Sequence, residues 1–581
     1  MLSIWMPCFL IHLAFISQVA LAEDYISSTA LAECSSSTAI SVNYFDAKMS
    51  RSGMLDLAFT GYLDISGNVA ADIVILVYGY EILNETISLC DLGLDSLCPM
   101  ASGAIDLPQA SLNVSSIAAA IPGIGYTVPD LDATVLVYVN NQSTGKSLSC
   151  LSADLSNGHT VYQAAVSWVF AVVIGVGLIG SIVASIRGLV NTATHLSFSS
   201  LSLLDFMQSQ GMVGLCSVNL PPIAQSWTQT FLWTLGIVYL GFQQTFSTWY
   251  LRATGGTPST IKRDFSANDR TPSRSLLRRA SSDGSDRSEI TVKGFSRMAY
   301  RAGIEPSNIF MTSYSSFIFV GLTLFVFNKL PQCLEDASMC LQRADRALVL
   351  RFLAINLPPI TSFGFWELSQ IDSSGIVVLT VTWWIGLILS LAWTTGNTIF
   401  RVQRARKLDI TPAYVLYSGM IGSKSILLHI HYRANAYYFS VIQQLYISVP
   451  KKQAIILVLI NAIMMGITIW IRPCIDGSTD RRAITTAVLH FLNSICVLIF
   501  SDIFGGPTIV VSVVGVIYCM YNAVYMLVLV MYIIIPLVRA VSMKNPEARY
   551  KILHTPIPLE LHDMSITACG KAEPSVRLLH S

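Results

Sequence analysis

Long uncharged stretches separated by short polar ones dominate the chain from residue 165 onward. A helix needs about 20 mostly apolar residues to cross a bilayer, and eight runs are close to or above this length: 165–186, 206–251, 309–327, 375–400, 434–449, 453–471, 483–501 and 503–538. The pattern predicts a polytopic α-helical membrane domain of about nine transmembrane helices, with first helices in 163–251 and the others in 308–538.

A different pattern precedes this region. Short runs rich in β-branched and aromatic residues occupy 55–65, 71–80 and 132–141, and Gly, Pro, Asn or Asp separate them; such runs are typical of strands. Two of the runs are nearly continuous in apolar residues, so either both strand faces are buried or one face lines a cavity that holds something apolar. Residues 23–162 are therefore predicted to form a small all-β sandwich.

The N-terminus carries secretory features. Residues 1–22 contain an apolar stretch and end in Ala20-Leu21-Ala22, which predicts a cleaved signal peptide. A lumenal or extracellular place for the sandwich is supported by its N-glycosylation sequons and by an even number of cysteines, which indicates two disulfides with three open connectivities. The sequons are at Asn84, Asn113 and Asn141, and the cysteines are Cys34, Cys90, Cys98 and Cys150. We expect the endoplasmic reticulum, another endomembrane or the plasma membrane.

Three polar segments interrupt or follow the apolar runs. Residues 252–307 form a Ser/Arg-rich loop with a basophilic phosphorylation candidate at Ser281, and 539–581 form a tail predicted to be disordered and cytosolic. A basic cluster indicates positive-inside topology, anionic lipid binding or both; it comprises Arg401, Arg404, Arg406, Lys407 and, beyond them, Arg433.

The pentapeptide NLPPI occurs twice, at 219–223 and 356–360. Paired prolines remove two helix donors, so both copies are predicted to mark helix ends or re-entrant points. Either 347–365 crosses the membrane and 196–218 does not, or the reverse. The second alternative places the 252–307 loop in the cytosol and Cys333 and Cys340 on the oxidising side, and it is the one that the loop and the cysteines favour.

Composition agrees with a membrane protein and gives little support to other classes. Hydrophobic residues make up 53% and charged residues 12%, and the net charge of +1 gives no reason to expect nucleic acid. The string GxGxxG at 175–180 lies inside an apolar run, where small residues favour close helix packing rather than nucleotide binding. His429 and His431 lack metal-ligand company, and His490 is a hydrogen-bonded structural residue or a proton relay. No enzyme motif appears.

Eleven segments follow one another in an order that matches a known family. They are YGY (78–80), LCPM (97–100), IPGIGYTVPDLDATV (121–135), SNGHTV (156–161), 220–237, 249–260, 308–312, WELSQIDS (366–373), 433–439, 471–480 and 491–507. In these segments the chain resembles fungal TRP-like membrane proteins, also called the flavin carrier family, which carry an N-terminal ML-like lipid-recognition domain. The resemblance covers about 23–538.

The resemblance implies a lipid-holding sandwich joined to a membrane domain linked to calcium homeostasis and to flavin uptake into the endoplasmic reticulum. It also implies disulfides Cys34–Cys150 and Cys90–Cys98. The expected partner is a membrane lipid or sterol, with a homo-oligomer also considered, and no nucleic acid. The lipid-pocket candidates are Tyr62, Val74, Leu76, Tyr78, Tyr126, Val135 and Val137.

Ionisable and amide side chains near the apolar runs suggest an ion path. The candidates are Glu367, Asp372, Asn461, Asn493 and Asp502, although Glu367 and Asp372 fit a headgroup position equally well; Gln243, Gln244 and Asn522 are further polar groups inside runs. The turn at 501–508 is too short for a re-entrant TRP filter. A calcium-linked cation channel or carrier is the leading hypothesis.

Two alternatives stay open: an FAD transporter and a non-transporting lipid-binding protein. FAD is anionic, so a path for it should gather Arg or Lys within the bundle. Arg351 is the only basic residue well inside a candidate span, which favours cation passage over direct flavin passage. The leading hypothesis has calcium as permeant or regulator, and the FAD alternative has FAD as the transported species; no covalently bound cofactor is predicted, and the metal is unknown.

Overall fold

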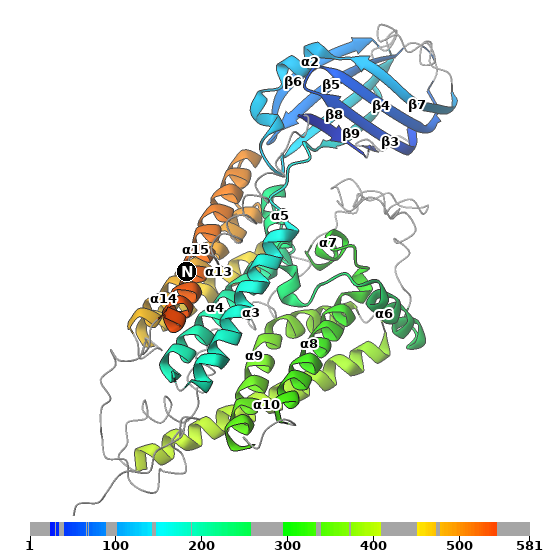
Figure 1. Ribbon diagram of the computed structural model, residues 1–581. Helices are drawn as coiled ribbons and strands as arrows, with labels where there is room; N and C mark the ends of the chain where they lie inside the picture. The colour runs from blue at the N-terminus through cyan, green and yellow to red at the C-terminus, as the bar shows by residue number, and fades with distance from the viewer. Residues whose placement is uncertain are drawn as a thin grey trace, which may run out of the picture. The chain divides into compact units, whose positions relative to one another are not determined.

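The computed structural model describes residues 24–29, 31–33, 40–65, 67, 69–88, 102–141, 147–187, 189–256, 294–332, 338–370, 373–407, 450–471 and 477–542. They form two compact units, one essentially the N-terminal β-rich part up to Val161 and one that begins at Tyr162 and holds the helices (Figure 1). The predicted signal peptide, Cys34, Cys90, Cys98, Ser281, Cys333, Asp372, His429, His431, Arg433 and the tail after Ser542 lie outside the described residues.

The N-terminal unit is a sandwich of two antiparallel sheets, which confirms the predicted fold class for this part. One sheet has the order β1-β3-β4-β7 and the other β2-β9-β8-β5-β6. The strands are β1 (Tyr25–Ser28), β2 (Ala32–Glu33), β3 (Ile40–Ser50), β4 (Met54–Leu63), β5 (Val69–Val77), β6 (Tyr80–Ser88), β7 (Gly103–Asn113), β8 (Ala133–Asn141) and β9 (Ser147–Leu155), with short helices α2 (Ser115–Ala120) and η3 (Gly123–Tyr126).

A two-residue turn sets the register of the β5–β6 hairpin. Val77 pairs with Tyr80, and the intervening Tyr78 and Gly79 both have positive φ, 52° and 78°. Two positive φ values define the type I′ turn, whose twist matches that of antiparallel strands. Because side chains alternate along a strand, this register sends Ile73, Ile75 and Val77 to the sandwich interior, where Ile75 is 5% exposed.

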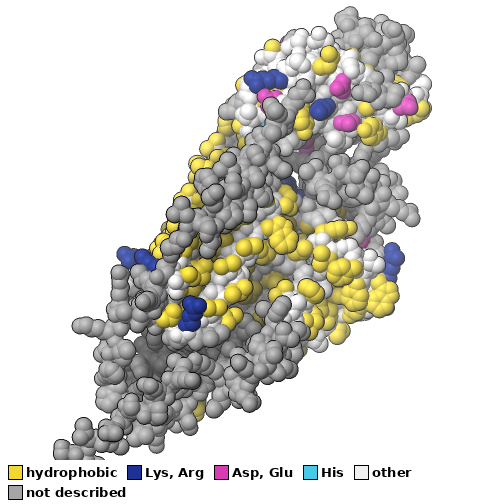
Figure 2. Space-filling model, viewed as in Figure 1, with side chains coloured by type: hydrophobic (Ala, Val, Ile, Leu, Met, Phe, Trp, Pro, Cys, Tyr) yellow, Lys and Arg dark blue, Asp and Glu magenta, His cyan; other side chains and the backbone are white. Residues whose placement is uncertain are grey.

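The second unit consists of helices. They are α3 (Ala164–Ile186), α4 (Val190–Gly214), α5 (Pro222–Gln229), η4 (Leu232–Leu235), α6 (Gly241–Ala253), α7 (Gly294–Arg301), η8 (Pro306–Asn308), α8 (Ile309–Gln332), α9 (Ser338–Gln370), α10 (Ser374–Lys407), α13 (Pro450–Ile471), α14 (Gly477–Phe500) and α15 (Thr508–Ser542). Figure 2 shows hydrophobic side chains gathered on the viewed face of these helices, with few charged ones among them.

Four helices in the described part of the chain are long and apolar enough to cross a bilayer: Ala164–Ala184, Lys451–Trp470, Gly477–Phe500 and Thr508–Val541. The apolar stretch Ser374–Ser390 of α10 is shorter. The helical membrane domain is therefore present, whereas the total of about nine spans stays a prediction. The turn between α14 and α15 is as short as expected, from Ser501 to Pro507.

The small residues of the GxGxxG string lie at a helix contact, as their position inside an apolar run predicts. A Cβ at Gly177 of α3 would collide with Ser200 of α4 and come within 2.8 Å of Ile533 on α15, and one at Gly180 would come within 2.6 Å of Leu537. Gly175 has no atom within 4 Å of its Cβ position. Close approach of three helices explains these glycines.

These neighbours give a matched test. Gly177→Ala is expected to lower the stability of the full chain by about 1–3 kcal/mol, because an added methyl group overpacks the α3–α4–α15 contact. Gly175→Ala adds the same methyl group to the same helix in open space and should leave the thermal midpoint in detergent unchanged. Equal midpoints for the two variants would refute this packing.

The polar loop predicted at 252–307 is ordered at its end, which corrects that boundary. Helix α7 buries Phe295, Arg297 and Met298 against the rest of the unit, with Arg297 4% exposed. The Arg297 guanidinium donates to the carbonyls of Gly214 (2.9 Å), Cys216 (3.0 Å) and Val218 (2.9 Å). These carbonyls lie at and just beyond the end of α4, where backbone carbonyls have no N–H partner within the helix.

The two NLPPI copies have different structures. The first lies between two helices, and its prolines begin the second of them: α4 ends at Gly214 and Pro222 opens α5, where a missing N–H costs nothing. The prediction is wrong for the second copy, since α9 continues through Pro358 and Pro359. Pro359 cannot donate to the Ile355 carbonyl, and Gln208 Nε2 of α4 donates to that carbonyl instead at 3.1 Å. Neighbouring side chains that replace lost donors let a membrane helix keep its prolines.

Candidate functional site

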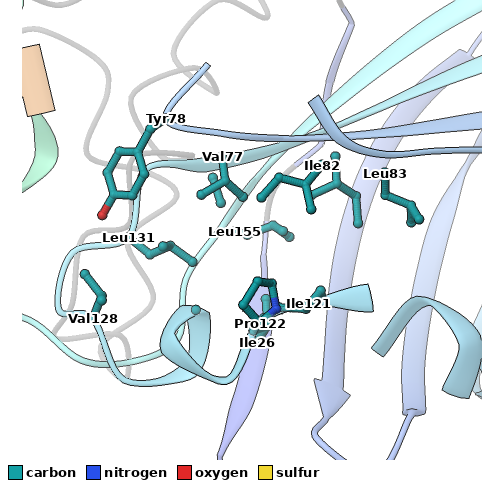
Figure 3. Close-up of a pocket in the computed structure, with 13 residues that line it drawn as sticks. Ile26, Val77, Tyr78, Ile82, Leu83, Ile121, Pro122, Val128, Leu131 and Leu155 are labelled. Carbon is teal, nitrogen blue, oxygen red and sulfur yellow. The ribbon is translucent and has the colours of Figure 1, made fainter. Parts of the chain in front are cut away.

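The sandwich contains an apolar pocket at the end near the β5–β6 turn (Figure 3). Its volume is about 210 Å³, and every lining side chain except Tyr78 is apolar. The lining comes from both sheets and from the 121–131 segment: Ile26, Ile75, Val77, Tyr78, Ile82, Leu83, Ile121, Pro122, Gly125, Val128, Leu131, Ala133 and Leu155. Ligand pockets usually measure about 300–1,000 Å³, so this one fits a slim apolar group such as part of an acyl chain.

Strand register decides which residues reach the pocket. Val77 and Ile75 line it, whereas the predicted Val74 and Leu76 alternate to the other face of β5. A β-bulge opposite Ile75 and Leu76 lets the adjacent residues Ile82 and Leu83 both line the cavity. Figure 3 shows Ile82 next to Val77 and Leu83 beyond Ile82.

The other predicted pocket residues are dispersed. Tyr78 lines the pocket, while Tyr126 and Val135 belong to the adjoining core, Val137 packs in the second core cluster, and Tyr62 is 53% exposed. In Figure 3 the Tyr78 hydroxyl points away from Ile82 and Leu83. Burial first, and then Asp132 and Asp130, raise the pKa of Tyr78, so the hydroxyl stays neutral.

The 121–131 segment, here called the pocket loop, forms hydrogen bonds with the last residues of the sandwich. Asn157, 4% exposed, donates through Nδ2 to the carbonyls of Gly125 (3.0 Å) and Val128 (2.7 Å). Asp130 accepts from Thr160 Oγ1 at 3.0 Å and from the Val161 amide at 2.8 Å. Because α3 begins at Ala164, the pocket loop is bound to the segment that leads into the first helix.

The predicted secretory modifications are tested only in part. Cys150 is disulfide-bonded, and its pairing with Cys34 stays a prediction. Asn84 on β6 and Asn113 at the end of β7 are exposed, as a glycan requires, and Asn141 ends β8. Glycosylation itself also stays a prediction.

A buried amide network connects four helices of the second unit. Asn522 on α15 exchanges two hydrogen bonds with Asn493 on α14, of 2.8 Å and 3.2 Å, and accepts from Gln210 Nε2 on α4 at 3.1 Å. Gln210 Oε1 in turn accepts from Tyr518 (2.6 Å) and from Trp227 of α5 (3.3 Å). Sequence reasoning selected Asn493 and Asn522 and missed Gln210 and Tyr518, although uncharged polar residues in apolar runs were the available signal.

The ion-path candidates do not all meet at one place. Asn461 is 8% exposed and donates to Leu457 O of its own helix α13 at 3.0 Å. Asp502 is exposed in the turn after α14, with φ of 54°. Glu367 on α9 is 1% exposed; its place on an ion path or at the headgroup level stays a prediction. His490 lies beside the Phe206 ring, 5.6 Å between centroids.

An apolar-pocketed β-sandwich joined to apolar helices with polar interior contacts defines an integral membrane protein. Comparison with known families agrees: the model of the transient receptor potential (TRP) ion channel matches residues 166–555, and that of the ML-like domain matches 26–161. The chain therefore belongs to the TRP ion channel family, with an N-terminal ML-like domain.

Curated relatives cover nearly the whole chain. Flavin carrier protein 2 of Saccharomyces cerevisiae is 30% identical over 584 residues, 91% of this chain and 74% of that protein. Flavin carrier protein 1 of the same yeast is 27% identical over 93% of this chain and 73% of its own length. The TRP-like ion channel pkd2 of Schizosaccharomyces pombe is 26% identical over 90% and 80%. No solved structure matches the chain.

Proposed function

We propose that this protein conducts cations across a membrane of the secretory pathway and that its N-terminal sandwich binds the apolar part of a lipid. The observation that carries the transport half is the distribution of polarity in the helices. Neutral amides such as Asn493 and Asn522 are buried at 3% and 0% exposure, whereas large apolar side chains such as Trp168 and Trp470 are exposed at 74% and 84%. Polar groups retained inside a membrane bundle commonly serve a substrate path.

The lipid half rests on the pocket. A cavity without polar lining other than Tyr78 favours an alkyl chain, because burying apolar surface stabilises by about 25 cal/mol per Å². Hydrogen bonds of Asn157 and Asp130 connect the 121–131 segment, which lines the pocket, to residues 157–161 just before α3. Lipid in the pocket can therefore influence the start of α3 through these contacts. A sterol is larger than 210 Å³ allows, so it requires the pocket to widen.

Flavin transport is the second candidate, favoured by the relatives' names and by one structural observation. Arg482 on α14 is 7% exposed, and its guanidinium donates to Ser199 Oγ at 2.8 Å and Thr479 Oγ1 at 3.0 Å. Among the described residues of the helical unit, Arg297 and Arg482 are the buried arginines, and guanidinium groups bind phosphates well. Both already donate to protein acceptors, so an FAD phosphate would have to displace those contacts.

Reconstitution of the full chain separates these functions. Liposomes loaded with a calcium dye or a potassium dye and incubated with labelled FAD should show cation entry and no FAD uptake. FAD uptake without cation entry would establish the second candidate and refute the first. Bound lipid without either flux would support the non-transporting alternative.

The pocket gives a prediction with a neighbouring control. Val77→Trp is expected to fill the cavity and to lower co-purified or added lipid at least about tenfold, a loss of about 1.4 kcal/mol in binding. Leu76→Trp adds the same side chain on the opposite face of β5 and should retain lipid. Mass spectrometry of lipid extracted from monodisperse protein measures both, and equal lipid content would rule out this pocket.

A further inference from the structure

Helix α6 has an inverted amphipathic pattern. Its exposed face carries Phe242, Phe246 and Trp249, at 74%, 50% and 61% exposure, whereas its inward face carries Gln243 and Gln244, at 4% and 2%. A soluble protein shows the reverse arrangement. Apolar residues outside and amides inside fit a helix that faces lipid on one side and a polar interior on the other.

Three amides converge on one turn at the start of α8. Gln243 Nε2 donates to Thr312 O at 2.7 Å, and Gln244 Nε2 donates to Thr312 Oγ1 at 2.8 Å. Thr312 Oγ1 donates to the Asn308 carbonyl at 2.8 Å, and Asn308 Nδ2 donates to Thr248 Oγ1 of α6 at 2.9 Å. The three amide groups therefore lie together between α6 and α8, which Figure 1 also draws as neighbours.

The amide nitrogens are satisfied, but the oxygens are not. Among the described residues, Gln243 Oε1, Gln244 Oε1 and Asn308 Oδ1 accept no hydrogen bond, although Asn308 is 0% exposed. Buried acceptors without a partner are uncommon and indicate bound water or an ion. Three such acceptors therefore belong to side chains that meet around a single turn of α8.

The cluster continues along the interrupted segment between α5 and α6. Ser313 Oγ, next to Thr312, donates to Leu235 O of η4 at 2.7 Å, and Gln208 Nε2 donates to Thr234 O at 2.9 Å. Gln208 Oε1 and the Asn356 side chain beside Ile355 also have no partner among the described residues. The unpartnered Gln208 oxygen therefore lies beside η4, and the unpartnered Asn356 amide follows Ile355 on α9.

The backbone of this segment supports the same interpretation. Between α5 and α6 the chain forms a two-residue turn, the short η4, a positive-φ residue at Gly236 (76°) and four residues without regular structure. Non-helical backbone at membrane depth occurs where protein covers it or where it lines a watery path. Interrupted helices of transporters bind their ions at such places.

We propose that Gln243, Gln244 and Asn308 form a transit site for an alkali cation, with Gln208 and Asn356 as the next oxygen ligands along its path. The site rests on the proposed transport function and names its cargo class. Neutral oxygens replace the hydration shell of a monovalent cation, as backbone carbonyls do in potassium channels. Calcium sites gain affinity from carboxylates, and none of the five residues supplies one.

Charge at Gln244 tests the site. In liposomes with imposed ion gradients, Gln244→Glu is expected to raise the calcium-to-potassium permeability ratio at least tenfold, and Gln244→Leu to lower rubidium flux at least tenfold. The matched control is Gln229→Glu on α5, whose amide exchanges hydrogen bonds with Arg301 (3.0 and 2.8 Å) outside the cluster. Its permeability ratio should equal that of the unmodified chain. Asn308→Asp is the second charge variant if Gln244→Glu does not fold.

A binding measurement separates failure of the site from failure of transport. Potassium in place of choline should raise the thermal midpoint of the detergent-purified chain, and Gln244→Leu should abolish that rise. If the chain passes no cation but this rise is lost in Gln244→Leu, the transport function is wrong and the site stands. A different result would show that the site is wrong and that the oxygens hold water only. In that case cations pass, but the variants change neither the calcium-to-potassium permeability ratio nor the rubidium flux, and they leave the potassium-dependent rise of the thermal midpoint unaltered. If the chain shows no cation flux and no potassium-dependent rise in its thermal midpoint, both the transport function and the site are refuted.

Discussion

Arg297→Met is expected to lower the stability of the full chain by about 3–5 kcal/mol, the cost typical of removing one side of a buried charged contact. The guanidinium donates to three carbonyls at and beyond the end of α4, at 2.9–3.0 Å, and the 4% exposed site admits little water to replace it. Methionine fills similar volume but donates nothing, so three buried acceptors lose their partner. The positive charge also favours this helix end through the helix dipole.

Two further variants isolate the cause. Arg297→Lys keeps the charge but loses the planar guanidinium group. Its stability should lie between that of Arg297→Met and that of the unmodified chain. Arg252→Met removes an exposed basic residue from the last turn of α6 and should change stability by no more than about 0.5 kcal/mol. Thermal midpoints by size-exclusion chromatography give the order, and a midpoint for Arg297→Met equal to that of Arg252→Met would contradict the proposed role.

Asn522→Leu is expected to destabilise the bundle by about 2–5 kcal/mol, because each buried donor left without an acceptor costs about 1–3 kcal/mol. Asn522 uses both amide hydrogens, toward Asn493 Oδ1 and Tyr518 O, and its oxygen accepts from Gln210 and Asn493. Leucine leaves the Gln210 and Asn493 amide hydrogens without this acceptor. The Asn522 contacts connect α4, α14 and α15, so their loss should loosen these three helices of the network.

Asn461→Leu is the matched control, since Asn461 is also buried but donates only within α13. Its expected effect is below 1 kcal/mol, the size of one ordinary hydrogen bond. Asn493→Leu combined with Asn522→Leu should cost less than the sum of the single variants, because both remove the same contacts. Additive losses, or equal losses at Asn461 and Asn522, would show that the network does not act as a unit.

Local patterns were sufficient where one segment determines its own structure. Signals in sequence identified the strands near 55–65, 71–80 and 132–141, the apolar helices, and a break in the helices near the first NLPPI. They did not identify the face of β5 toward the pocket, since Val74, Ile75, Leu76 and Val77 are all apolar and alternation is absent. Only pairing with β8 and β6 resolves that choice.

Long-range contacts explain the remaining differences. By sequence, the second NLPPI predicts a helix end. The helix continues because Gln208, from a helix far earlier in the chain, donates to the Ile355 carbonyl in place of the missing proline N–H. Arg297 lies in a segment that is polar by composition, and carbonyls at and just beyond the end of α4 give its charge a buried position. Gln243 and Gln244 were recognised as polar groups in an apolar run, but their unpartnered oxygens follow from the geometry around Thr312.

The pairing of β1 with the end of the sandwich has a consequence for biosynthesis. Ser27 and Ser156 exchange two backbone hydrogen bonds, at 2.8 and 2.9 Å, and β9 completes its sheet only at Leu155. Pairings this distant in sequence form late and slowly. The sandwich therefore cannot close until shortly before α3 is synthesised, so folding of the N-terminal domain and insertion of the first membrane helix are neighbouring events in time.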